Sequence, residues 1–242
     1  MIKAVFLDID DTLLSFQEYT RQAMREGFAK FGIGTYTEDM FPLFHQYNGE
    51  LWRAIERGEL TYERLLKIRW KYIFERLGLS GDGEAFEDYF KGELFHNAIV
   101  IPGAMELLEY LHGKVLICAA SNGPDGQQQN RLKISGMMPY FDALFISEEI
   151  GVSKPSPAYF DECFRRLSAL AGETILPEET LILGDSMTSD IGGGAAYGLK
   201  TCLYRPEYEG EPLDPKPDYI ITDLREMREI LPELLKPGKE SL

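Results

Sequence analysis

Short apolar runs recur along the chain, and turn residues bound each of them. Their hydrophobic residues follow one another without a clean polar alternation, which is typical of strands buried on both faces of a parallel sheet. We expect one strand from each run. The runs are Ala4–Leu7, Val115–Ala119, Ala143–Ile146, Thr180–Leu183, Thr201–Leu203 and Tyr219–Ile221.

Segments with helical signals lie between most of these runs. Pro102–Leu111 and Ala158–Leu170 have apolar residues at helical spacing. Pro124–Ile134 begins with proline and stops at Gly136, which is a helix-ending pattern, and a last helix is expected from about Leu224. Asp223 precedes the last helix and Glu226 follows, which is the pattern of a capping box. Because strands and helices alternate, the sequence predicts an α/β fold, a Rossmann-like open parallel sheet flanked by helices.

Residues 15–94 interrupt this alternation with segments that all have helical spacing. These segments are Glu18–Phe31, Thr37–Arg57, Tyr62–Leu77 and Glu84–Leu94. We therefore expect an all-helical domain at 15–94, inserted into an α/β core formed by 1–14 and 95–242. The tail beyond Lys236 is expected to fray.

The net charge of the chain limits the classes of partner that it can bind. The chain has 242 residues, with 40 acidic side chains against 25 basic ones and a net charge of −15. Such a surface repels nucleic-acid phosphates and anionic lipids, so we expect neither a nucleic-acid polymer nor a membrane as partner. A small phosphorylated metabolite is still compatible, because a metal ion and a few cationic side chains can reverse the potential locally.

The cysteines indicate a reducing compartment. Cys118, Cys163 and Cys202 are too few and too irregularly spaced for a disulfide framework or a zinc ribbon. We expect Cys118 and Cys202 to be buried, because they lie in strand-like runs. The N-terminal segment lacks the pattern of a signal peptide, so the expected localisation is cytoplasmic.

Acidic residues follow two of the expected strands. Asp8, Asp10 and Asp11 come directly after the first run, and Asp185 comes directly after Thr180–Leu183. Asp8 and Asp10 point the same way if the segment is extended. Carboxylates crowded at one sheet edge repel one another, and Mg²⁺, which prefers oxygen ligands, would compensate them. The alternative for each is a structural turn or helix cap.

Two further segments could bind phosphate oxygens. Ser121, Asn122 and Gly123 follow the second strand and offer a hydroxyl, an amide and a backbone N–H. Lys154 stands before Pro155 and could supply a cation. Taken alone, an Asn-Gly segment is most often a simple turn, and a lone surface lysine is usually only solvated.

In this order the four segments resemble the haloacid dehalogenase-like superfamily of aspartyl-nucleophile phosphatases. They read DIDDTLL from Asp8, SNG from Ser121, SKP around Lys154 and GDSMTSD from Gly184. The helical insert matches the position of the superfamily's small cap. Residues 51–59 and 146–152 look similar to the bacterial house-cleaning pyrimidine 5′-nucleotidase subgroup.

This resemblance implies a different catalytic or metal-binding role for each aspartate. Asp8 would attack phosphorus and become an aspartyl-phosphate. Asp10 would protonate the leaving oxygen and then activate water. Mg²⁺ would be held by the Asp8 side chain, the Asp10 backbone carbonyl and Asp185. The true dehalogenases lack an aspartate at the position of Asp10, so this residue favours phosphoryl chemistry. Asp11 replaces a glycine common among relatives.

The other motif residues would serve the phosphoryl group. Ser121 and Lys154 would bind its oxygens and offset charge in the transition state, with help from the side chain or backbone of Asn122. Asp190 would orient water at the metal or pair with Lys154.

The helical insert is expected to close over the site and select the substrate. Most of its aromatic residues should form its own core. Phe16 is the best candidate to stack on a base, and Asn48 and Arg69 are candidates for polar substrate contacts. The alternative for Arg69 is a surface salt bridge.

The expected function is a Mg²⁺-dependent phosphomonoester hydrolase acting through an aspartyl-phosphate on nucleoside 5′-monophosphates. A phosphoglycolate or sugar-phosphate phosphatase, a sugar-phosphate mutase and a non-catalytic binding domain remain alternatives. The intact set of motif residues speaks against the binding domain, since a scaffold needs none of them.

Overall fold

A computed structural model describes residues 1–235 and divides the chain into two compact units. One unit consists of Met1–Ser15 together with the chain from Val100 onwards, and the other is Phe16–Ile99. The tail that we expected to fray beyond Lys236 lies outside the described residues.

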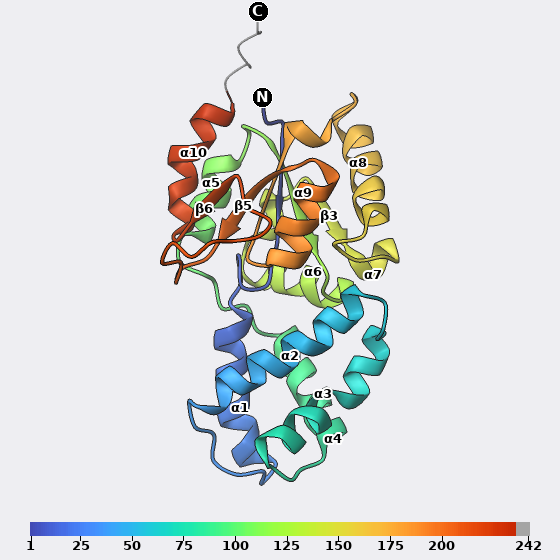
Figure 1. The fold of residues 1–242 in the computed structure, drawn as a ribbon, viewed down its shortest axis with the longest axis vertical. Coiled ribbons are helices and arrows are strands. Elements are labelled where there is room, and N and C mark those ends of the chain that lie inside the picture. Colours follow the sequence, from blue (N-terminus) through green and yellow to red (C-terminus); the bar gives the residue numbers. More distant parts are fainter. Residues whose placement is uncertain (236–242) are drawn as a thin grey trace, which may run out of the picture. The chain divides into compact units, whose positions relative to one another are not determined.

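The first unit is built on a parallel sheet whose strand order is β3-β2-β1-β4-β5-β6 (Figure 1). All pairings between neighbouring strands of the described residues are parallel. Every apolar run of the sequence forms a strand, so the predicted fold class is confirmed. The strands are β1 (Ala4–Leu7), β2 (Leu116–Ser121), β3 (Ala143–Ile146), β4 (Thr180–Gly184), β5 (Lys200–Tyr204) and β6 (Tyr219–Ile221).

Helices follow the strands in the alternation that the sequence predicts. They are α5 (Ala104–Leu111), α6 (Asp125–Ile134), α7 (Ser147–Ile150), α8 (Pro157–Ala171), α9 (Gly193–Tyr197) and α10 (Met227–Leu234). The predicted capping box is present, with Asp223 capping a short 3-10 turn over Leu224–Glu226 that leads into α10.

The register of the strands decides which helices cover which face. Phe6 of β1 lies beside Ile182 of β4, and its ring packs 5.6 Å from that of Phe164 in α8. Cys202 pairs with Leu183, the residue after Ile182, so it points to the other face. There its sulfur lies 3.8 Å from that of Met227 in α10. Helices α8 and α10 therefore cover opposite faces of the sheet (Figure 1).

The second unit is a group of four helices in the described residues. They are α1 (Phe16–Lys30), α2 (Met40–Glu56), α3 (Tyr62–Leu77) and α4 (Gly83–Phe95). Trp70 lies at the centre of their core, with ring centroids 5.2 Å from Phe44, 4.5 Å from Phe86 and 5.1 Å from Phe90. As expected, most aromatic residues of the insert build its own core.

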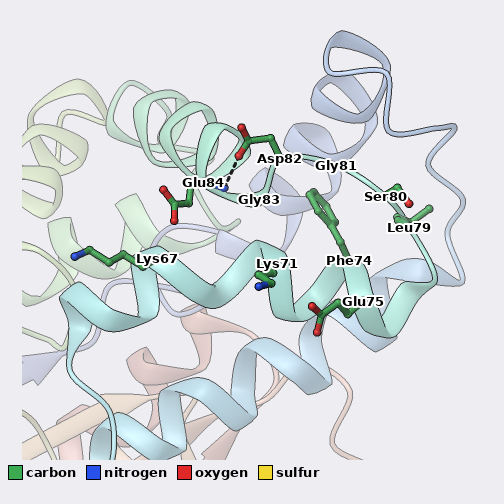
Figure 2. A pocket seen from close by; sticks show the side chains of 10 residues that line it. All are labelled: Lys67, Lys71, Phe74, Glu75, Leu79, Ser80, Gly81, Asp82, Gly83 and Glu84. Carbon is green, nitrogen blue, oxygen red and sulfur yellow. Dashed lines mark hydrogen bonds between the residues drawn. The ribbon is translucent and has the colours of Figure 1, made fainter.

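A surface hollow of about 460 Å³ lies where α3 approaches the start of α4 (Figure 2). Asp82 caps α4 by accepting from the backbone N–H groups of Glu84 and Ala85 at 3.1 and 3.0 Å. A Cβ atom on Gly83 would lie 2.5 Å from the backbone nitrogen of Lys71, so glycine permits this close approach of α3 and α4.

Within residues 1–235, none of the helices combines the length and apolarity that a membrane crossing requires.

Candidate functional site

The central strands β2, β1 and β4 end side by side, and each delivers a residue of the predicted site. Ser121 is the last residue of β2, Asp8 follows β1 and Asp185 follows β4. The backbone N–H of Asp8 donates to the carbonyl oxygen of Leu183 at 2.9 Å, which extends the β1–β4 pairing by one residue. Chain order reverses between β1 and β4, and ligands of open α/β sheets bind at such a switch point.

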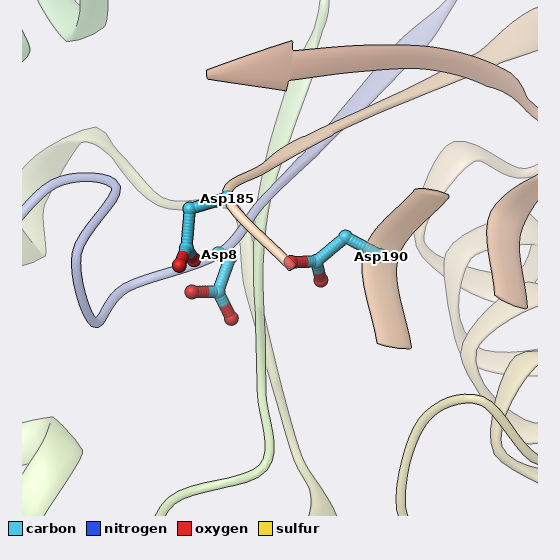
Figure 3. A group of neighbouring side chains, drawn as sticks. All are labelled: Asp8, Asp185 and Asp190. Carbon is cyan, nitrogen blue, oxygen red and sulfur yellow. The ribbon is translucent and has the colours of Figure 1, made fainter. Parts of the chain in front are cut away.

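Three carboxylates meet at this edge (Figure 3). One oxygen each from Asp8, Asp185 and Asp190 lies within 4.8 Å of the other two. Burial raises the pKa of Asp8 to about 8, against the opposing effect of Lys154. Burial and the neighbouring charges of Asp8 and Asp11 raise the pKa of Asp185 well above its ordinary value. Such a cluster is under-compensated and fits a divalent cation with oxygen ligands.

Lys154 is the cation within this cluster. Its Nζ donates to Oδ1 of Asp8 at 2.8 Å, to Oδ1 of Asp190 at 2.6 Å and to the carbonyl oxygen of Ala120. Burial lowers the pKa of Lys154, but the charges of Asp190 and Asp8 raise it further, so the net shift is upward. The ammonium group therefore stays charged beside the expected nucleophile.

Asp190 is positioned by a π-helical turn over Met187–Gly192. Its Oδ2 accepts from the backbone N–H of Ser186 at 3.1 Å, while Oδ1 is bound by Lys154. Of the two roles expected for Asp190, the geometry favours pairing with Lys154. Gly184 makes room for it, because a Cβ there would lie 2.2 Å from Oδ2 of Asp190.

Asn122 has a different environment from the one expected of a phosphate ligand. Its Nδ2 donates to the carbonyl oxygen of Lys154, and its Oδ1 accepts from the backbone N–H of Lys154, both at 2.9 Å. Both ends of the carboxamide are thus used within the protein. The side chain ties the β2 loop to the lysine loop, so the expected side-chain contact with phosphate is not supported.

Two residues that sequence reasoning missed bind Asp10. Arg131 donates from Nη1 to Oδ1 of Asp10 at 2.5 Å, and Gln128 donates from Nε2 to Oδ2 at 2.6 Å. Both come from α6, whose sequence is mostly polar, so its buried face does not stand out. The signal was the spacing of three residues, which places both side chains on one face of a helix that directly follows the Ser121 segment.

Asp11 adopts a left-handed backbone conformation with φ of 57°. Its N–H donates to the carbonyl oxygen of Leu14 at 2.8 Å, which closes the turn after the acidic segment. Glycine suits this conformation best, and aspartate is among the residues that tolerate it. The geometry thus explains how aspartate fits a position where the family resemblance led us to expect glycine.

The three candidate substrate contacts all belong to the helical unit. The ring of Phe16 packs edge-on against Phe90 at 6.0 Å, and Asn48 is buried in α2. Arg69 is buried and forms two hydrogen bonds with Glu87, including Nε to Oε2 at 2.8 Å. The alternative of a surface salt bridge is wrong, because both partners are buried. A substrate contact by Arg69 is not supported either, since Glu87 binds its guanidinium. Stacking of Phe16 on a base stays a prediction.

The sequence and the fold are similar to those of known proteins. The sequence profile of the haloacid dehalogenase-like hydrolases matches residues 2–198. YfnB of Bacillus subtilis, named as a HAD-hydrolase, is 33% identical over 95% of this chain and 95% of its own. A crystal structure of YfnB, described as bound to magnesium, has a TM-score of 0.84 and covers 95% of this chain and 98% of that one.

Several relatives carry names of phosphatases. The pyrimidine 5′-nucleotidase YjjG of Escherichia coli is 32% identical over 94% of this chain and 96% of its own. The glyceraldehyde 3-phosphate phosphatase of Methanopyrus kandleri is 30% identical over 98% of this chain and 100% of its own. The chain belongs to the haloacid dehalogenase-like hydrolase family, and the predicted family resemblance is confirmed.

Proposed function

We propose that this protein is a Mg²⁺-dependent phosphomonoester hydrolase that acts through an aspartyl-phosphate on Asp8. The observation that carries the proposal is the second carboxyl group, Asp10, whose two oxygens are held by Arg131 and Gln128 near the carboxyl end of β1. A halide leaving group needs no proton, whereas the alcohol of a phosphate monoester does. A fixed acid–base carboxyl therefore favours phosphate transfer.

In the first step, an oxygen of Asp8 forms a bond to phosphorus as the bond from phosphorus to the leaving oxygen breaks. Asp10 gives its proton to that oxygen. In the second step, water attacks the same phosphorus, Asp10 takes a proton from it, and the bond to Asp8 breaks to release phosphate. The Nζ of Lys154 lies 2.8 Å from Oδ1 of Asp8, and its charge offsets the negative charge of the phosphoryl group in both steps.

The acidic cluster supports magnesium as the metal. The side chains of Asp8 and Asp185, together with the backbone carbonyl of Asp10, would hold the ion, while both oxygens of Asp190 have partners in the protein. When bound, Mg²⁺ supplies positive charge to the phosphoryl oxygens and neutralises the mutual repulsion of the carboxylates.

Nucleoside 5′-monophosphates are the substrate class that we propose. The relative YjjG is named as a pyrimidine 5′-nucleotidase. By their sequence, the segments at 51–59 and 146–152 resemble that subgroup. A sugar-phosphate substrate is the second candidate, because another relative at similar identity is named as a glyceraldehyde 3-phosphate phosphatase. We place the reaction in the cytoplasm, which the three free, buried cysteines support.

The decisive experiment measures phosphate release from nucleoside monophosphates, phosphoglycolate and hexose phosphates, with Mg²⁺ and then with EDTA. Asp8→Asn should abolish release, whereas Asp161→Asn, at an exposed carboxyl of α8, should not. The ranking of substrates decides between the two classes. Absence of release from every substrate contradicts the proposal, and phosphoryl transfer to an added sugar phosphate would identify a mutase.

A further inference from the structure

The orientation of Asp10 is set by buried groups of α6. The side chain of Asp10 is 32% exposed, whereas the guanidinium that contacts it belongs to a fully buried Arg131. A nearby carboxylate offsets the desolvation of a buried guanidinium, so the ion pair with Arg131 holds Asp10 to this side of the site. Gln128, also fully buried, binds the second oxygen of Asp10.

Arg131 also fixes which end of the Gln128 carboxamide faces Asp10. Oε1 of Gln128 accepts from Nη1 of Arg131 at 2.9 Å, while Nε2 donates to Asp10. The opposite orientation would set the amide oxygen against a carboxylate and the NH₂ group against a guanidinium. Because both contacts would then be repulsive, the hydrogen-bond network admits one orientation.

The same carboxamide determines the direction of the Ser121 hydroxyl. Oγ of Ser121 accepts from Nε2 of Gln128 at 2.9 Å and from the backbone N–H of Gly123 at 3.1 Å. A hydroxyl has two lone pairs and one proton, so with both lone pairs used the proton must be donated elsewhere. Phosphoryl oxygens are acceptors. Glycine at 123 permits the arrangement, because a Cβ there would lie 2.4 Å from Nε2 of Gln128.

We infer that Gln128 and Arg131 are positioning residues that hold the Asp10 carboxyl group in the orientation needed for the second step and fix Ser121 as a donor to phosphate. The inference rests on the proposed phosphatase function. Both α6 side chains donate to Asp10, which suits the carboxylate that takes a proton from water in the second step. Without them the carboxylate can rotate into solvent, and hydrolysis of the aspartyl-phosphate slows.

The test separates the two chemical steps with p-nitrophenyl phosphate, whose leaving group needs no proton. In stopped flow, Arg131→Met and Gln128→Leu should release a rapid burst of nitrophenolate close to one equivalent of enzyme. Turnover after the burst should be about tenfold to hundredfold slower than in the wild type. A variant that merely folds less well would lose burst amplitude and turnover in equal proportion.

A second variant controls for the effect of lost packing on turnover. Gln128→Glu keeps the size of the side chain and its contact with Arg131, but it replaces the donor that faces Asp10 and Ser121. The same burst and slow turnover are expected. Gln129→Leu and Lys133→Met are matched controls on the same helix. Gln129 donates to Asp125 and Lys133 is exposed, and both variants should behave like the wild type.

The outcomes distinguish the inference from the proposed function. Turnover of Gln128→Glu and Arg131→Met within about threefold of an active wild type overturns the inference and leaves the proposed function intact. A parallel loss of burst and turnover in both variants also overturns it. Failure of the wild-type protein to release phosphate from any substrate contradicts the proposed function itself.

Discussion

Asn122 and Lys154 are joined by a reciprocal pair of hydrogen bonds, in which the carboxamide of Asn122 both donates to and accepts from the backbone of Lys154 at 2.9 Å. The pair links the loop after β2 to the segment before Pro155. The backbone of Lys154 is thereby fixed, and its Nζ is directed at Asp8 and Asp190. Asn122 thus influences the carboxylates of Asp8 and Asp190 through the lysine.

Asn122→Asp should reduce activity through this link. The substitution replaces the Nδ2 donor by a carboxylate oxygen, which then faces the carbonyl oxygen of Lys154 without a proton between them. An unsatisfied acceptor costs about 1–3 kcal/mol, so kcat should fall by about fivefold to hundredfold where this cost is lost from the transition state. Steady-state kinetics measures the effect. Asn97→Asp, outside the site, is the control, and an unchanged kcat in Asn122→Asp would exclude the positioning role.

The acidic cluster should make the metal-free protein less stable as pH rises. In the unfolded chain Asp8 titrates near its ordinary value of 3.8, but in the folded protein its pKa is about 8. Between these values the folded state keeps a proton that the unfolded state has lost. The free energy of unfolding therefore falls as pH rises from 3.8 to about 8, and below 3.8 this contribution vanishes.

Asp185→Asn tests this relation. The variant removes one carboxylate from the cluster, so in EDTA at pH 8 its Tm should exceed that of the wild type by about 2–4 °C, with the difference shrinking toward pH 4. Mg²⁺ at about 100 times its Kd should stabilise the wild type by about 2.7 kcal/mol and the variant far less. Calorimetry with and without Mg²⁺ measures both effects. An equal response to Mg²⁺ in the two proteins would remove Asp185 from the metal site.

Gly184→Ala should damage the site through Asp190. The added Cβ would lie 2.2 Å from Oδ2 of Asp190, so either the carboxylate or the end of β4 must move. Because Lys154 binds that carboxylate, we expect a loss of about 1–3 kcal/mol in the free energy of unfolding together with reduced kcat. Gly92→Ala, inside α4 with open space around it, should instead stabilise the protein by about 0.5–1 kcal/mol. Urea denaturation compares the two.

The sheet was predictable because its signal is local. Apolar runs buried on both faces mark parallel strands, and the acidic residues that follow β1 and β4 must meet where those neighbouring strands end. The partners of Asp10 were not predictable in this way. Gln128 lies 118 residues from Asp10 in the chain, and its helix carries almost no hydrophobic pattern. Long-range polar pairing leaves no periodic pattern in the sequence. For the same reason, the sequence suggests a substrate contact for Arg69 and does not reveal its pairing with Glu87.

Arg69 and Glu87 should stabilise the helical unit without contributing to chemistry. Both side chains are buried and pair between α3 and α4, and the guanidinium lies 4.8 Å from the centroid of the Phe90 ring. Arg69→Met leaves the Glu87 carboxylate buried without its partner, so the free energy of unfolding should fall by about 3–5 kcal/mol. The double variant Arg69→Met with Glu87→Leu removes both charges and should regain most of this loss.

Two measurements check the pair. Chemical denaturation of the single and double variants gives the coupling free energy, and KM for the best substrate is measured under conditions where each variant is folded. We expect a coupling of several kcal/mol and an unchanged KM in the double variant, because the substitutions restore packing without a buried charge. A raised KM in the stable double variant would instead return Arg69 to the substrate site, where its charge rather than its packing would be required.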